Sequence, residues 1–400
     1  MNQSVSLANE RGMNDSVGKG GAAVLVVGHL AGMVDMVALP LWVGTLMQAY
    51  RFTPQTAGLT VTLFLLFVAL TSMALSPLFP RLPRRVVAAC GYLLAACCFY
   101  IAVGLSEGAD LLPKMLALHA LAGVGVGAGL SMTHGGMGRT KNPHRMFAIA
   151  NSILGVFAVG FLGLMPHVIQ SVGGHSIFLA FTAIMLVAAV VYAFRYPRLQ
   201  TGEARQSAPV AKIPRAAWFA IVAVVFLTLN YAMVFSFIER VGVHRGFGAN
   251  MVAGVLLTLG LVNLVPGPLA ALLDRKFSAV SVAVVVPVIQ ALLALVIFNA
   301  LDFKTYAVAA VFCVVPAMFG HIFLFGLISK LDPSGRAPAS TPAMVMTGSS
   351  IGPLLGGTLV QAFGYTAVGA ASVVIACAGI AAACLIRLQL RGMASVREAV

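Results

Sequence analysis

Twelve long apolar segments follow one another along this chain of 400 residues, and they constrain its fold more than any other feature. A helix of about 20 apolar residues is long enough to cross the hydrocarbon core of a bilayer. Hydrophobic residues make up 60% of the sequence and charged residues only 9%, far below the ~25% of a soluble domain. This composition excludes a soluble enzyme and a disordered chain. The sequence therefore predicts an all-α integral membrane protein with twelve transmembrane helices, at 22–48, 56–79, 86–105, 111–133, 146–171, 177–195, 216–238, 249–273, 280–300, 306–328, 343–363 and 366–386.

The basic residues gather on one side of these spans. The chain has 25 Lys and Arg residues against 11 Asp and Glu residues, a net charge of +14. With the amino terminus inside, about four fifths of the basic residues lie on the cytoplasmic side, in line with the positive-inside rule. We therefore interpret the charge as a topology signal and expect no nucleic-acid partner. Both termini are expected in the cytoplasm of a multi-pass protein of the bacterial inner membrane, without a cleavable signal peptide.

The two halves of the chain resemble each other. When the sequence is shifted by 191 positions, Arg84-Arg85 aligns with Arg275-Lys276, and other Pro, Gln and Gly positions at helix ends also coincide. Such a register is typical of an internal duplication. The predicted parts are a cytoplasmic tail at 1–21, a six-helix bundle at 22–196, a cytoplasmic linker at 197–215, a second six-helix bundle at 216–387 and a tail at 388–400.

Four short segments stand out from the apolar background. The loop after the second span, 76–85, reads SPLFPRLPRR, and the equivalent loop of the second half contains Asp274-Arg275-Lys276. The fourth span contains HALAGVG at 119–125, and the eleventh contains GSSIGPLLGG at 348–357. They resemble the G-x-x-x-D-R-x-G-R-R, R-x-x-Q-G-x-G and G-x-x-x-G-P-x-x-G-G patterns of the major facilitator superfamily, with His119 in the position of the second pattern's Arg.

The resemblance implies two bundles that work by alternating access, with helices one, four, seven and ten lining a central cavity. It also implies gating at the motif positions, where Pro80 replaces the family's Asp, so that the first gate is expected to rely on arginines alone. Glu239, at the outer end of the seventh span, is expected to form a solvated pair with Arg240. The candidate gating residues are Arg81, Arg84, Arg85, Glu239, Asp274, Arg275, Lys276, Gly352 and Pro353.

Ionisable residues are costly inside a membrane and are therefore functional candidates. Asp35 is the only carboxylate near the middle of a span. It either carries a proton or hydrogen-bonds a neighbouring helix. His119 is either a second proton site or a neutral ring bonded to a backbone carbonyl. Six of the seven ionisable groups in or beside the spans fall on the four helices that the resemblance places around the cavity.

Further residues of these helices are candidates for the cavity wall. His29 and His321 contact substrate or simply pack, and Asn230 and Tyr231 offer hydrogen bonds. The aromatic rings of Trp42 and Phe235 either face the cavity or belong to the core. The candidate substrate cavity therefore comprises His29, Trp42, Asn230, Tyr231, Phe235 and His321.

The leading hypothesis is a proton-coupled secondary transporter that exports a small organic compound, a drug or metabolite, by proton antiport. The preference for export over uptake depends on segment 348–357, because the pattern that this segment resembles is associated with proton antiporters. Proton-coupled uptake of a small organic acid is the alternative, and a metal exporter, a non-transporting receptor and a membrane enzyme are remoter ones. The sequence has no P-loop and no HExxH motif, so we expect no cofactor and no metal. The expected partners are a small-molecule substrate, protons and the lipid bilayer, and we expect a monomer.

Overall fold

A computed structural model gives the fold of the chain. It describes residues 18–105, 108–197, 213–273, 276–332 and 341–398. Twelve helical segments in these ranges are long and apolar enough to cross a membrane, which confirms the predicted all-α membrane architecture. The predicted gating residues Asp274 and Arg275, most of the linker and most of the first tail lie outside the described residues.

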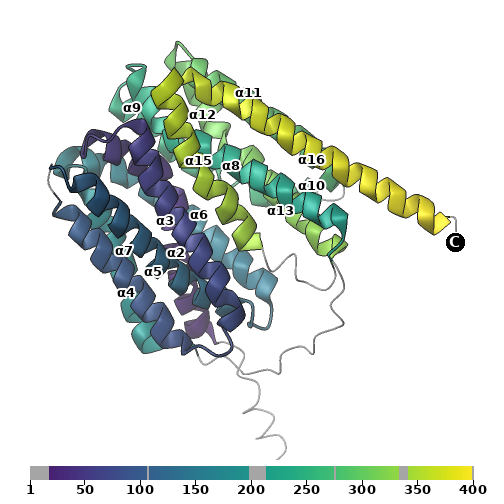
Figure 1. Cartoon of the computed structure of the whole chain (residues 1–400), viewed down its shortest axis with the longest axis horizontal. Coiled ribbons are helices and arrows are strands. Elements are labelled where there is room, and N and C mark those ends of the chain that lie inside the picture. The colour runs from purple at the N-terminus through teal and green to yellow at the C-terminus, as the bar shows by residue number, and fades with distance from the viewer. Residues whose placement is uncertain (1–17, 106–107, 198–212, 274–275, 333–340, 399–400) are drawn as a thin grey trace, which may run out of the picture.

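The first half of the chain forms a bundle of six long helices, drawn from purple to blue in Figure 1. In this bundle α5 packs on both α3 and α4, α7 packs on α4, and α2 contacts α5, α6 and α7. The helices are α2 (Lys19–Gln48), α3 (Pro54–Leu75), α4 (Arg84–Val103), α5 (Leu111–Met137), α6 (Pro143–Val172) and α7 (Ser176–Arg195), with the short 3₁₀ helix η1 (Ser76–Leu78) after α3.

The second half forms the other bundle, in which α8 is central and contacts α11, α13, α15 and α16. Two of its predicted spans are each broken into two helices. Pro266 and Pro316 lack the N–H group of a helical hydrogen bond, and a break lies just before each of them. The helices are α8 (Arg215–His244), α9 (Ala249–Val262), α10 (Pro266–Leu273), α11 (Ala279–Asn299), α12 (Phe303–Phe312), α13 (Val314–Leu331), α15 (Thr341–Phe363) and α16 (Thr366–Glu398).

Local sequence signals set several helix ends. Thr53 caps α3, because its side chain accepts a hydrogen bond from Thr56 N, and Pro54 occupies the first helical position. Asn142 caps α6 in the same way, ahead of Pro143. Gly173 ends α6 at φ 107°, a conformation that glycine adopts without a steric penalty.

Two helices are longer than the hydropathy pattern predicted. The seventh span was expected to end at 238, whereas α8 runs to His244; the twelfth was expected to end at 386, whereas α16 runs to Glu398. Hydropathy detects only the segment that suits the hydrocarbon core, whereas the helical hydrogen bonds continue beyond it, through Gly242 in α8 and Gly392 in α16.

The helices run alternately between two ends of the molecule. We call the end where α2 and α8 begin, at Lys19 and Arg215, the basic end, and the opposite end the far end. Between the bundles, α3 packs on α15, α2 on α8 and α6 on α9. Figure 1 shows α15 crossing from the second bundle against α3 of the first. The contacts of α3 with α15 at Gly58 and of α2 with α8 at Gly44 lie towards the far end, whereas α9 meets α6 near the middle of α6, at Val159 and Gly260.

Candidate functional site

The central helices change their exposure along their length. Every residue of α2 from Val34 to Leu46 is buried, and so is every residue of α8 from Leu227 to Ile238. Nearer the basic end, Ala23 of α2 and Val222 of α8 are exposed. The bundles are therefore closed against each other in the far half, and the central helices become accessible towards the basic end.

A reciprocal contact of α3 and α15 forms the closed part. A Cβ on Gly58 would overlap with the backbone carbonyl of Pro353, and a Cβ on Gly357 would overlap with that of Pro54. On each helix the proline precedes the glycine by four residues, and the carbonyl of each proline meets the glycine of the other helix. Two hydrogen bonds cross the same contact, from Leu354 N to Thr62 Oγ1 (3.1 Å) and from Gln55 N to Gln361 Oε1 (3.2 Å). Since Pro353 and the neighbouring Gly352 lie in this part of α15, the predicted gating segment borders the closed contact. A Cβ on Gly352 would come within 2.6 Å of Met233 N on α8.

Asp35 lies in the buried part of α2 and is 2% exposed. Its Oδ1 accepts a hydrogen bond from Met36 N (2.8 Å), and its Oδ2 is buried without a partner among the described residues. Gly28, Asp35 and Trp42 are seven residues apart and therefore share one face of the helix. Since Gly28 contacts Tyr192 and Trp42 contacts Phe181, this face points into the first bundle rather than towards the second.

His119 and Trp42 belong to an aromatic cluster inside the first bundle. Both are 0% exposed, and their rings stack at 5.4 Å. Trp42 Nε1 donates to His119 Nε2 (3.3 Å), while His119 Nδ1 lies 2.8 Å from Met115 O. A neutral imidazole fits both contacts: Nδ1 donates to the carbonyl of Met115, and Nε2 accepts from Trp42. The structure brings Trp42 and His119 together, and neither ring hydrogen-bonds the Asp35 carboxylate.

His29 meets a residue that the sequence analysis did not select. Its Nδ1 lies 3.1 Å from Nε2 of His134 on α5, and the two ring centroids are 5.3 Å apart. His29 is 2% exposed, whereas His134 is half-buried. Next to the pair, Tyr92 donates to Gly28 O (2.8 Å) and Thr133 bonds Tyr192 (2.8 Å).

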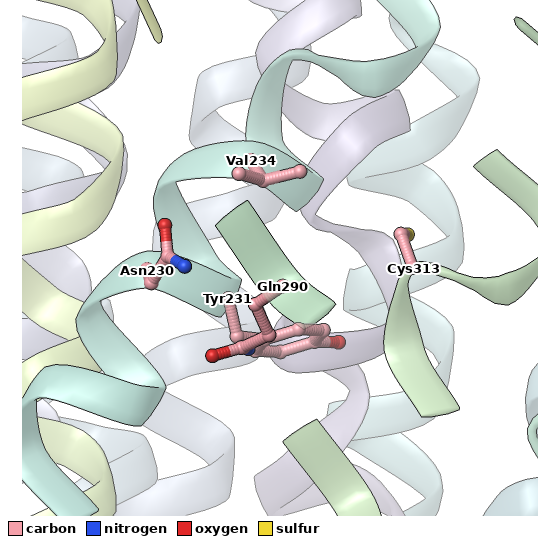
Figure 2. Close-up of a pocket in the computed structure, with 5 residues that line it drawn as sticks. All are labelled: Asn230, Tyr231, Val234, Gln290 and Cys313. Atoms are coloured by element: carbon pink, nitrogen blue, oxygen red, sulfur yellow. The ribbon is translucent and has the colours of Figure 1, made fainter. Parts of the chain in front are cut away.

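Asn230 and Tyr231 line a small pocket inside the second bundle (Figure 2). The pocket has a volume of about 10 Å³, room for about one water molecule and far less than a small-molecule site requires. Its other lining residues are Val234 of α8, Gln290 of α11 and Cys313 between α12 and α13. Asn230 Oδ1 accepts a hydrogen bond from Ser372 of α16 (2.6 Å) and Gln290 donates to Leu227 O (3.5 Å), so these amides also bind helices together.

The remaining predicted cavity residues are buried. Phe235 is 2% exposed and stacks on Tyr231 at 5.2 Å. His321 is 8% exposed and stacks on Phe325 at 5.4 Å, with its Nε2 buried and without a partner among the described residues. In this conformation the predicted cavity residues are therefore divided between the two bundle interiors, and they do not form one chamber.

Glu239 lies where α8 meets α2. A Cβ on Gly44 would come within 2.6 Å of Glu239 Oε2 and 3.4 Å of Arg240 Cδ, so only glycine leaves room for both side chains. The Oε2 of Glu239 and the Nε and Nη1 of Arg240 are buried and have no hydrogen-bond partner among the described residues. The expected solvated pair is wrong, because α8 continues past it to His244 and α2 covers it.

The arginines of the first gating segment organise the turn before α4. Arg84 donates from Nε to Phe79 O (3.2 Å) and its guanidinium lies 4.8 Å from the Phe79 ring centre, while Arg139 lies 5.0 Å from the same ring. Arg85 donates to Ala193 O (2.5 Å), and Arg81 is exposed. Lys276, the described member of the equivalent segment, is also exposed.

The sequence analysis counted His134 among the seven ionisable groups, as an interfacial residue at the inner end of the fourth span, and did not select it as a site. It did not select four polar residues that the structure places beside the candidate sites: Tyr92, Thr133, Tyr192 and Gln290. Each of these four is a polar side chain within an apolar span, and that signal was applied only to ionisable groups and to the seventh and eighth spans. Among the described residues, no three His, Cys, Asp or Glu side chains gather as a metal site requires.

Comparisons with known proteins agree with this architecture. The sequence profile of the Major Facilitator Superfamily matches residues 24–335, and the chain belongs to this superfamily. No curated protein shows significant sequence similarity to it. Its fold is similar to crystal structures of a bacterial homologue of the human lysosomal transporter Spinster, in inward-facing unoccupied and occupied conformations. The similarity to the unoccupied form has a TM-score of 0.64 at 12% identity, covering 92% of this chain and 94% of that one. For the occupied form the values are 0.66, 14%, 92% and 96%.

The protein is therefore a multi-pass membrane transporter that works by alternating access, and not an enzyme. It belongs with the carriers that bind small-molecule substrates within the membrane.

Proposed function

We propose that the protein is a proton-coupled secondary transporter that exports a small organic compound by proton antiport. The observation that carries this proposal is Asp35, an acid buried at membrane depth with one oxygen unpartnered among the described residues. An ionised carboxylate is expensive in such surroundings unless it is paired, whereas the protonated acid is tolerated. The acid can therefore release its proton only in a conformation that brings water or a cation to it. Such a dependence of protonation on conformation couples proton movement to transport.

Direction and orientation are part of the same proposal. The basic end carries Arg84, Arg195 and Arg215 and is assigned to the cytoplasm by the positive-inside rule. The closed contact then faces the outside, and the conformation is open inward. Export is supported by segment 348–357, whose Gly357 and Pro353 take part in that contact. We assign the protein to a bacterial inner membrane as a monomer.

The gating and cavity assignments follow from this orientation. Glu239, Gly352 and Pro353 belong to the outer gate, and Arg81, Arg84, Arg85, Asp274, Arg275 and Lys276 to the inner one. The cavity residues His29, Trp42, Asn230, Tyr231, Phe235 and His321 face substrate only after the helices have moved from the packing described here.

Replacing Asp35 by Asn tests the coupling. Purified protein is first screened by thermal shift against metabolites and drugs. Each compound that raises the unfolding temperature is then assayed in proteoliposomes that contain the pH-sensitive dye pyranine. We expect Asp35→Asn to abolish proton movement driven by the compound, while exchange of labelled for unlabelled compound persists. Asp110→Asn, an exposed acid beside Lys114, is the matched control.

Two outcomes would contradict the proposal. Wild-type proton movement in Asp35→Asn would remove this acid from the mechanism. Compound flux in the wild type without any proton movement would remove proton coupling altogether. Protons that move in the same direction as the compound, and not against it, would favour the uptake alternative.

A further inference from the structure

The pair of His29 and His134 has a defined capacity for protons. The 3.1 Å contact between His29 Nδ1 and His134 Nε2 needs an N–H group on one ring and a lone pair on the other. Two neutral imidazoles satisfy it, and so does one imidazolium with one imidazole. Two imidazolium rings do not, because both facing nitrogens would carry hydrogen. The pair can therefore accept one proton, and only one, without losing its contact.

Proton binding also changes the strength of this contact. A hydrogen bond in which the donor is charged is shorter and roughly twice as strong as a neutral one. The two rings belong to different helices, His29 to α2 and His134 to α5. A proton on the pair therefore holds α2 more firmly against α5, and its release loosens that contact.

The pair lies towards the basic end, where the central helices become accessible. His134 stands three residues before the end of α5 at Met137 and is half-buried, and the neighbouring Asn151 of α6 is exposed. His29 is covered, and the side chain of the exposed Asn151 interacts with it. A proton on the pair therefore has its route to water at the basic end, past the half-buried ring of His134 and past Asn151.

In the part of the chain that the structure describes, the groups around the pair do not include a fixed counter-charge. Tyr92 of α4 and Tyr192 of α7 approach through Gly28 O and Thr133, and Phe147 of α6 packs edge-on against His134 at 5.3 Å. The cations that follow His134 in sequence are Arg139, which lies over Phe79, and Lys141 and Arg145, which are both exposed. In the helices α2 to α7 the sequence contains one carboxylate, Asp35, which is six residues from His29 and about 9 Å further along the axis. A proton on the pair is therefore not trapped by an adjacent acid and can return to water.

We propose that His29 and His134 together form a proton acceptor of the transport cycle, which exchanges its proton with water at the basic end and adjusts the contact of α2 with α5. This role rests on the proposed proton coupling. It is separate from that of Asp35, which lies six residues further along α2 and contacts neither ring through a hydrogen bond among the described residues.

A measurement without substrate tests the pair directly. Protein labelled with ¹⁵N-histidine is reconstituted in nanodiscs and its ring nitrogens are followed by NMR between about pH 8 and about pH 3, a range wide enough to cover buried histidines. We expect His29 and His134 to shift in one linked step, and His134→Gln to remove the response of His29. Rings that titrate independently, each unaffected by loss of the other, would overturn the proposal.

Transport of the compounds found by thermal shift gives a second test. His29→Gln and His134→Gln are each expected to reduce proton-driven flux by about tenfold, and the double variant no further, because the two rings act as one unit. Compound exchange without net proton movement should persist, and His167→Gln, an exposed histidine of α6, should behave as wild type. Undiminished proton-driven flux in both single variants would refute the role of the pair. If Asp35→Asn abolishes proton coupling and the histidine variants do not, the proposed function stands and the role of the pair is refuted. If the wild type moves no protons, the proposed function fails, and the NMR titration alone decides whether the two histidines share a proton.

Discussion

At the scale of single residues, His119 shows how a family position can change its role. The resemblance places an arginine there, but this chain has a neutral imidazole between Trp42 Nε1 and Met115 O in a fully buried aromatic cluster. With both ring nitrogens occupied, the histidine serves the packing of the first bundle. This geometry favours the structural interpretation over a second proton site.

Restoring the family residue should therefore damage the fold. We expect His119→Arg to destabilise the first bundle by ~3–5 kcal/mol, because a guanidinium would be buried without a partner. Thermal unfolding in detergent, followed by intrinsic fluorescence, measures the loss, with His167→Arg at an exposed position as control. A stable His119→Arg protein whose transport has a shifted pH profile would restore His119 as a proton site.

The sequence could reveal Asp35 but not its direction. A lone acid in an apolar span is visible without any structure, because few such residues are tolerated there. Which way it points depends on the rotation of α2, which is set by the packing of Gly28 against Tyr192 and of Trp42 against Phe181. The contact of His134 with His29 could not be predicted for the same reason, since the two residues lie 105 positions apart.

At the scale of helices, the contact of α3 with α15 controls the far end. We expect Gly58→Ala to force the two helices apart, because its Cβ would overlap with Pro353 O, and to shift the protein towards the state that is open at that end. A cysteine introduced at Gln361, beside this contact, should then react faster with a membrane-impermeant maleimide. Gly254→Ala, on α9 with nothing within 4 Å of its Cβ, is the matched control.

Equal labelling of Gln361→Cys in the Gly58→Ala and Gly254→Ala backgrounds would show that the glycine contact does not hold the far end closed. The sequence predicted this segment of α15 as a gate from its Gly and Pro pattern alone. It could not identify the partner, because Gly58 is an ordinary glycine in the pattern of the second span.

At the scale of the whole molecule, the number of spans followed from hydropathy and the two-bundle arrangement from the internal repeat and the family resemblance. Hydropathy did not predict where α8 and α16 end or where the helices break before Pro266 and Pro316, because these features depend on hydrogen bonding. The division of the predicted cavity residues between two interiors also needed coordinates, since one sequence does not specify a conformational state.

The orientation in the membrane is open to direct test. We expect alkaline phosphatase fused after Val400 to be inactive and green fluorescent protein fused there to be fluorescent, because the basic end is assigned to the cytoplasm. Phosphatase fused after Leu301, at the far end between α11 and α12, should be active. The reverse pattern would invert the topology and, with it, the direction of transport.

The two proline–glycine pairs of α3 and α15 also restrict how the halves can move. Each helix offers a carbonyl to a glycine of the other, so sliding along the helix axis would carry both oxygens off their glycines and, after one turn of about 5.4 Å, onto residues that have a Cβ. Tilting about the crossing point keeps both carbonyls over their glycines. The crossing therefore acts as a pivot that permits rocking of one half over the other but resists a piston-like stroke.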